Sequence, residues 1–216
     1  MDNRKPTSDL TSTSPRILVA GIGNIFLGDD GFGVEVALRL AQRPQPDGVR
    51  VRDFGIRGLD LTYALAEECD VAILIDAVPR GKPPGTLFVI EPGPAEMAAP
   101  APLDPSDPAG FTPMIDGHGM DPAKVLRLVG AIGGKLQHVL VVGCEPTPFD
   151  PEIDMDMSLS APVQAAVDEA VALVESLVQK IGAGQYGSWA TSPRDSFAAD
   201  ASPKGEVGHG HLQSLQ

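Results

Sequence analysis

Five short apolar runs alternate along the chain with segments in which apolar residues recur every three or four positions. The runs are Ile17–Ala20, Val49–Phe54, Val71–Ile75, Thr86–Ile90 and His138–Val142. The third run (VAILI) and the fifth (HVLVV) are apolar almost throughout, which is typical of strands covered on both faces. The alternation of strands and helices predicts an α/β sandwich, with helices on both sides of one five-stranded sheet.

The helical segments follow the first, second and fourth runs and close the domain. Their apolar stripes include Val34–Ala41, Leu59–Ala66 and Val125–Val129, and the clearest helix spans Val163–Ile181. Pro162 suits the first turn of that last helix, and Ser160 suits its N-cap.

One connection breaks the pattern. Only Ala77–Gly85 joins the third and fourth runs, and this link contains three prolines and two glycines. A parallel crossover needs about a dozen residues or more. We therefore expect the fourth strand to run antiparallel to the third, which makes the sheet mixed. Residues 92–117 then form a long connection rich in Pro, Ala and Asp, which predicts a functional or mobile loop.

The ends of the chain differ in composition from the middle. Residues 1–15 and 183–216 lack apolar periodicity, so we expect flexible tails on either side of one domain at 16–182. The formal net charge is −13; the first tail sums to zero and the last to −1, which leaves −12 on the domain. This acidity argues against nucleic acid or an anionic membrane as partner. Without a secretory signal or an apolar span, we expect a cytoplasmic protein whose two cysteines, Cys69 and Cys144, are free thiols.

The loop after the first strand is rich in glycine, but its spacing does not fit a dinucleotide site. The third glycine of a G-x-G-x-x-G motif would fall at Phe26. Asp29 and Asp30 would also stand at the helix entrance, where they would repel a pyrophosphate. One aspartate could simply cap the helix. Two in such a loop suggest a cationic ligand instead.

Two further side chains are expected at the same edge of the sheet. Asp76 follows the third apolar run, and the carboxyl ends of strands are where open α/β sheets bind ligands. His118 lies just before the helix predicted at 122–132, whose N-terminus should face this edge. Two carboxylates and one imidazole make an incomplete ligand shell for a divalent transition metal, with Asp29 and Asp30 as rivals.

Other chemistries find less support. Cys144 and Glu145 follow the fifth strand and could line the same cleft or form only a turn. No serine lies in a nucleophile elbow, which gives no support to Ser-His catalysis. The aspartates could suggest an aspartic protease, but the chain has no Asp-Thr-Gly signature.

Residues 16–182 resemble the hydrogenase maturation protease family. The resemblance rests on ILVAGIGN at 17–24, GDDGFGV at 28–34, LIDA at 74–77, His118 and VGCEP at 142–146. It implies a three-layer sandwich around a five-stranded mixed sheet. It also implies a metal site of Asp30, Asp76 and His118, in which this chain has Asp at position 30 where many members have Glu. Asn24, Asp29, Cys144 and Glu145 would then line the substrate cleft.

The reaction that this resemblance implies is one cut. It removes the C-terminal extension of the large-subunit precursor of a nickel–iron hydrogenase after nickel insertion, with nickel supplied by that precursor. The metal ligands would also be the catalytic residues. Two alternatives remain open from the sequence: a nickel-binding assembly factor that does not cut, and a nucleotide-binding oxidoreductase.

Overall fold

A computed structural model describes residues 14–67, 69–93, 122–134, 136, 138–148 and 157–185. Five strands form one sheet in the order β2-β1-β3-β5-β4. Neighbouring strands are parallel except for β4, which pairs antiparallel with β5. The strands are β1 (Ile17–Ile22), β2 (Val49–Gly55), β3 (Val71–Ala77), β4 (Leu87–Ile90) and β5 (His138–Cys144).

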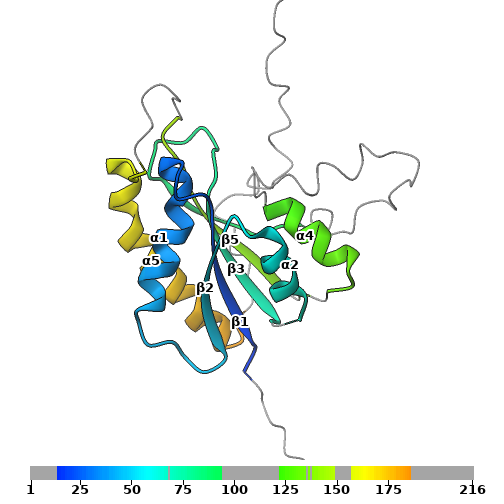
Figure 1. Ribbon diagram of the computed structural model, residues 1–216. Helices are drawn as coiled ribbons and strands as arrows, with labels where there is room; N and C mark the ends of the chain where they lie inside the picture. The colour runs from blue at the N-terminus through cyan, green and yellow to red at the C-terminus, as the bar shows by residue number, and fades with distance from the viewer. Residues whose placement is uncertain are drawn as a thin grey trace, which may run out of the picture.

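Helices cover both faces of this sheet, as Figure 1 shows. Helices α1 and α5 lie side by side on one face, and α2 and α4 lie on the other. Their bounds are α1 (Phe32–Ala41), α2 (Gly58–Glu67), α4 (Pro122–Ala131) and α5 (Ala161–Gly182), and a short 3-10 turn, η1 (Gly28–Gly31), precedes α1. The predicted three-layer sandwich is confirmed, as is the antiparallel direction of β4. This strand pairs with β5 at the sheet edge rather than with β3.

Four of the strands, β1, β2, β3 and β5, extend beyond the apolar runs that predict them. Strands β3 and β5 continue in register past their apolar residues, where Asp76 pairs with Gly143 and Ala77 with Cys144. Backbone hydrogen bonds set these strand ends, since the ladder is indifferent to the polarity of the side chain. Asp76 is therefore the next-to-last residue of β3, the central strand of the sheet.

The core has two halves, one on each side of the sheet. The apolar stripe of α5 packs with α1 on one face of the central strands, and the stripes of α2 and α4 pack on the other face. Helix α1 approaches closely because Gly33 has no side chain: a Cβ there would lie 2.0 Å from the carbonyl oxygen of Ile75. The start of α1 is therefore held against the carboxyl end of β3.

A second glycine contact shapes the edge of the sheet. Gly143 on β5 pairs with Phe88 on β4, and a Cβ at Gly143 would lie 2.2 Å from the Phe88 ring. The ring thus fills the space that a side chain at position 143 would need. The guanidinium of Arg80 lies over the same Phe88 ring, 5.8 Å from its centre.

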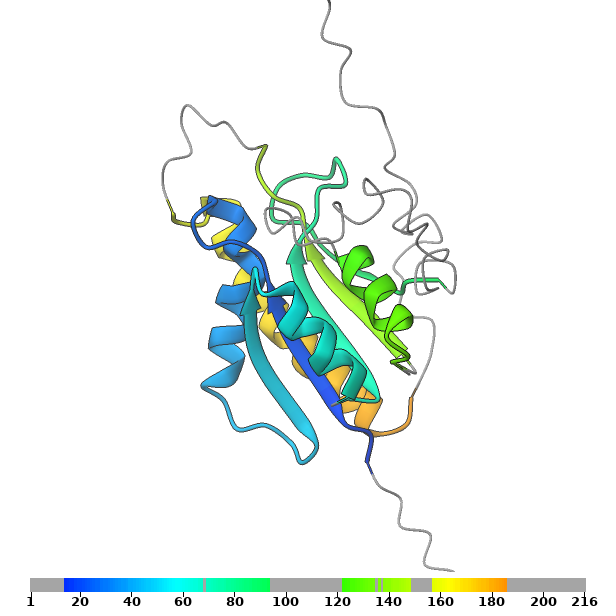
Figure 2. The ribbon, with the colours of Figure 1, turned by 45° about the vertical axis from the view of Figure 1, so that its right-hand side comes forward.

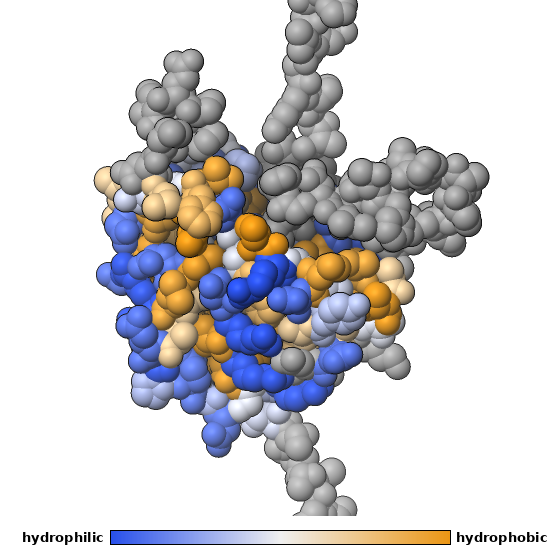
Figure 3. Space-filling model, in the orientation of Figure 1, coloured by the Kyte–Doolittle hydropathy of each residue, from blue (hydrophilic) through white to orange (hydrophobic). Residues whose placement is uncertain are grey.

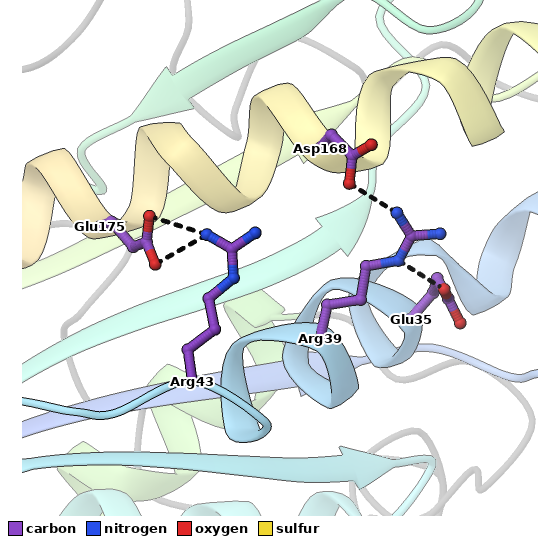
Figure 4. Close-up of polar contacts among 5 residues, drawn as sticks. All are labelled: Glu35, Arg39, Arg43, Asp168 and Glu175. Carbon is purple, nitrogen blue, oxygen red and sulfur yellow. Dashed lines mark hydrogen bonds and ion pairs between the residues drawn. The ribbon is translucent and has the colours of Figure 1, made fainter.

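Ion pairs join α1 and the segment just after it to α5 on the outer surface (Figure 4). Arg39 binds Glu35 at 2.8 Å and Asp168 at 2.6 Å, and Arg43 binds Glu175 at 3.0 Å. Exposed pairs of this kind contribute roughly 0–1 kcal/mol each. They therefore add little to the stability of the fold.

The remaining expectations concern the cysteines and the ends of the chain. Cys69 and Cys144 are both free thiols, as expected, and both are buried. The predicted tails lie largely outside the described residues, as does most of the predicted 92–117 loop. Within the described part of the chain, no helix is long and apolar enough to cross a membrane.

Candidate functional site

A cleft of about 680 Å³ opens at the carboxyl end of the sheet. Figure 2 shows that the loops following β1, β3 and β5 all leave the sheet at this end. These loops, including the three residues that precede α5, supply most of its lining: Leu27, Gly28, Asp29, Asp30, Ala77, Pro79, Gly81, Glu145, Pro146, Thr147, Pro148, Ser158, Leu159 and Ser160. The cleft therefore lies where the sequence predicts a ligand site.

The loop between β1 and α1 is built by consecutive hydrogen-bonded turns. The Phe26 N–H donates to the side-chain oxygen of Asn24 at 3.0 Å, and the Leu27 N–H donates to the Asn24 carbonyl at 3.0 Å. The Asp30 N–H then donates to the Leu27 carbonyl at 3.1 Å. Asn24 thus shapes the loop that presents both aspartates, a role typical of an Asx turn.

Asp30 is a half-buried carboxylate that lines the cleft. Its Oδ2 accepts a hydrogen bond from the Asn24 N–H at 2.7 Å, and no other described residue donates to it. Burial raises the pKa of Asp30, and the Asn24 hydrogen bond partly offsets that rise. The Oδ1 atom is left for a ligand, and a cation there would relieve the cost of burying the charge.

Asp29, the next residue back, has a different set of partners. Its carboxylate accepts hydrogen bonds from the Thr147 N–H at 2.9 Å, the Ser160 N–H at 2.6 Å and the Ser160 hydroxyl at 2.8 Å. We call this arrangement the Asp29 clasp. It ties the β1–α1 loop to both ends of the connection between β5 and α5. Asp29 lines the cleft as expected, but these contacts disfavour it as a rival metal ligand.

The capping role considered for an aspartate of this loop is not seen, whereas the N-cap position predicted for Ser160 is correct. Neither aspartate makes a side-chain cap on η1 or α1. Ser160 does occupy the N-cap position of α5, with Pro162 in the first turn, yet its hydroxyl makes no cap hydrogen bond. The hydroxyl instead donates to Asp29 and accepts from the Thr147 hydroxyl. A tertiary carboxylate outcompetes the local backbone donors here.

Asp76 lies at the carboxyl end of β3, next to β1 in the sheet. Its side chain is 5% exposed, and its Oδ1 accepts a hydrogen bond from the Ala77 N–H at 2.9 Å. Asp30 and Asp76 are thus brought to the same edge of the sheet. His118 lies outside the described residues, so the complete ligand set stays a prediction. Among the described residues, no three His, Cys, Asp or Glu side chains are grouped as a metal site.

Cys144 is the last residue of β5 and Glu145 follows it, and both are buried. Burial, with smaller contributions from Asp29 and Glu145, raises the pKa of the Cys144 thiol to about 12. A thiol with that pKa is protonated at neutral pH and is no nucleophile. Glu145 lines the cleft, and its carboxylate accepts hydrogen bonds from the N–H groups of Arg80 at 2.7 Å and Gly81 at 2.9 Å.

Glu145 therefore holds the β3–β4 loop as Asp29 holds the β5–α5 connection. Two carboxylates join the three walls of the cleft, and Asp30 accepts the fewest hydrogen bonds of the three described carboxylates that line it. Sequence reasoning missed Thr147, Ser160 and the backbone of Arg80. The one signal for them is the proline-rich stretch 146–148, which continues an apolar strand at the edge where ligands bind.

The chain is similar in sequence and in fold to known proteins. No family model matches the chain. It is 31% identical to the hydrogenase expression/formation protein HupM of Azotobacter chroococcum mcd 1 over 195 residues, which covers 90% of this chain and 83% of HupM. It is 32% identical to the hydrogenase 2 maturation protease of Escherichia coli K12, covering 77% and 95%. Among solved structures, the E. coli hydrogenase maturating endopeptidase HybD aligns with a TM-score of 0.55 and 27% identity, covering 76% and 93%.

Proposed function

The chain belongs to the hydrogenase maturation protease family, and on that premise we infer that it is the endopeptidase that removes the C-terminal extension of a hydrogenase large-subunit precursor. The reaction is hydrolysis of one peptide bond in a folded partner. We propose further that the partner contains nickel and iron, and that its nickel is what the cleft recognises.

One observation carries the nickel proposal: Asp30 has a carboxylate oxygen without a described partner in a cleft whose neighbouring carboxylates are occupied. A buried carboxylate with a raised pKa favours a bound cation. Oxygen donors from Asp30 and Asp76, with an imidazole nitrogen from His118, suit a divalent transition metal. Three protein ligands leave positions that precursor side chains can fill.

In this proposal nickel is part of the substrate. The ion arrives already held by precursor thiolates and gains Asp30, Asp76 and His118 as further ligands. Binding then depends on the metal state of the precursor, which confines the cut to loaded subunits. The walls held by Asp29 and Glu145 position the peptide of the precursor, and Asp30, whose Oδ1 has no described hydrogen-bond partner, is the group that orients a water molecule on the scissile bond.

The test incubates the protein with nickel-loaded or with empty precursor at equal concentration. Mass spectrometry then measures how fast each precursor loses its extension. We expect the loaded precursor to lose its extension about a thousandfold faster, which corresponds to about 4 kcal/mol of additional binding. Casein serves as a control for general proteolysis. Equal cutting of both precursors, or ready digestion of casein, contradicts nickel gating. Tight binding without any mass loss identifies a non-cleaving assembly factor instead.

A further inference from the structure

Three consecutive apolar residues are exposed on the β1–α1 loop. Ile25 is 49% exposed, Phe26 65% and Leu27 41%. Isolated exposed apolar residues are ordinary on protein surfaces. A run of three has no benefit for folding or solubility, and its presence indicates a function. We call these residues the apolar ledge.

The apolar ledge is held in place by the fold. Asn24 accepts hydrogen bonds from the N–H groups of Phe26 and Leu27, and the Leu27 carbonyl accepts one from Asp30. Both ends of this loop enter regular structure, at β1 and at η1. A fixed loop loses little conformational freedom when it binds a partner, which favours affinity.

The ledge is continuous with the cleft. Leu27 lines it, and the lining beyond is largely apolar, with Pro79, Pro146 and Leu159 among its members. Met157 is 62% exposed and directly precedes the lining residue Ser158. Figure 3 shows hydrophobic surface gathered over the end of the molecule where this loop lies.

We propose that the apolar ledge binds apolar side chains of the precursor peptide that enters the cleft. The inference rests on the proposed function, because it names what the same site recognises beside the metal. The run contains no charged side chain, so apolar contact is what it offers a partner. A second copy of this chain is the poorer occupant, since two molecules that each carry a net charge of −13 repel one another.

The test measures the affinity of the nickel-loaded precursor for the wild-type protein and for Phe26→Ser and Leu27→Ser. Leu38→Ser is the matched control, because Leu38 is 47% exposed on α1 and does not line the cleft. We expect a loss of tenfold or more in affinity for Phe26→Ser, and a similar rise in KM for cutting, with kcat little changed. Phe26→Leu should restore most of the affinity, and the melting temperatures should match the wild type.

Unchanged affinity in both ledge variants overturns the proposal, as does an equal loss in Leu38→Ser. If the wild-type protein is dimeric by light scattering and Phe26→Ser is monomeric, the ledge binds a second copy and the proposal is wrong. Failure of the proposed function has a different result. A wild-type protein that binds the precursor without cutting it refutes the peptidase, and the affinities still decide the role of the ledge.

Discussion

Replacing Asp29 by alanine should destabilise the domain, because the Asp29 clasp joins segments that are distant in sequence. The change removes the acceptor for three hydrogen bonds, two of them from backbone N–H groups. Hydrogen bonds to a charged partner contribute about 1.5–3 kcal/mol each when desolvated. The clasp is partly exposed, and water can replace some of what is lost. We therefore expect a total loss of about 3 kcal/mol.

Urea unfolding followed by circular dichroism measures this loss as a lower midpoint at unchanged slope. The melting temperature should fall by about 6–12 °C for a domain of this size. Ser160→Ala removes only the hydroxyl and should cost about 1 kcal/mol. The double variant should cost less than the sum of the two single changes, because both remove the bond between the Ser160 hydroxyl and Asp29.

A loss below about 0.5 kcal/mol for Asp29→Ala is the range of an ordinary surface substitution. That result, or strict additivity in the double variant, would refute the idea that the clasp holds the cleft walls. Precursor cutting should fall in Asp29→Ala even below its melting range, since both Thr147 and Ser160 line the cleft.

Three other changes test separate parts of the structure. Cys144→Ala should retain precursor cutting, because the buried thiol has a pKa of about 12 and is protonated; loss of activity in a folded variant would point to thiol chemistry. Gly33→Ala should cost about 3 kcal/mol or more in urea unfolding, since the new Cβ would lie 2.0 Å from the Ile75 carbonyl; wild-type stability would contradict the close approach of α1. Asp30→Asn should abolish cutting yet raise the melting temperature at pH 7. Burial raises the pKa of Asp30, so the folded protein binds this proton more tightly than the unfolded chain, and stability falls as pH rises through that window. The gain in melting temperature over the wild type should vanish on acidification. A gain that is the same at every pH would contradict a raised pKa of Asp30.

The apolar pattern predicts most of the fold because the central strands are buried on both faces. The runs at 71–75 and 138–142, together with the α5 stripe, identify the sheet and one of its covering helices. The short link at 77–85 predicts the direction of β4 from chain length alone. The pattern fails at the strand ends, where Asp76 and Gly143 continue the ladder without apolar side chains.

The site is less predictable, because its polar contacts join residues that are far apart in sequence. Asp30 and Asp76 are found from topology, since parallel strands end at one edge. Asp29 and Ser160 are separated by 131 positions, and local capping rules assign each of them a different role. Likewise the Glu145 carboxylate accepts hydrogen bonds from the backbone N–H groups of Arg80 and Gly81. Every residue except proline has such a group, so the sequence does not indicate these partners.

The contact between Gly143 and Phe88 has a consequence for how such chains can diverge. Phe88 does not line the cleft, yet its ring lies beneath Arg80, whose N–H is held by the Glu145 carboxylate. A larger residue at 143 would push the ring, and with it the edge strand, away from that wall. A larger residue at position 143 is therefore expected only together with a smaller residue at position 88. Evolution is expected to change the two residues as a pair, although neither lines the cleft.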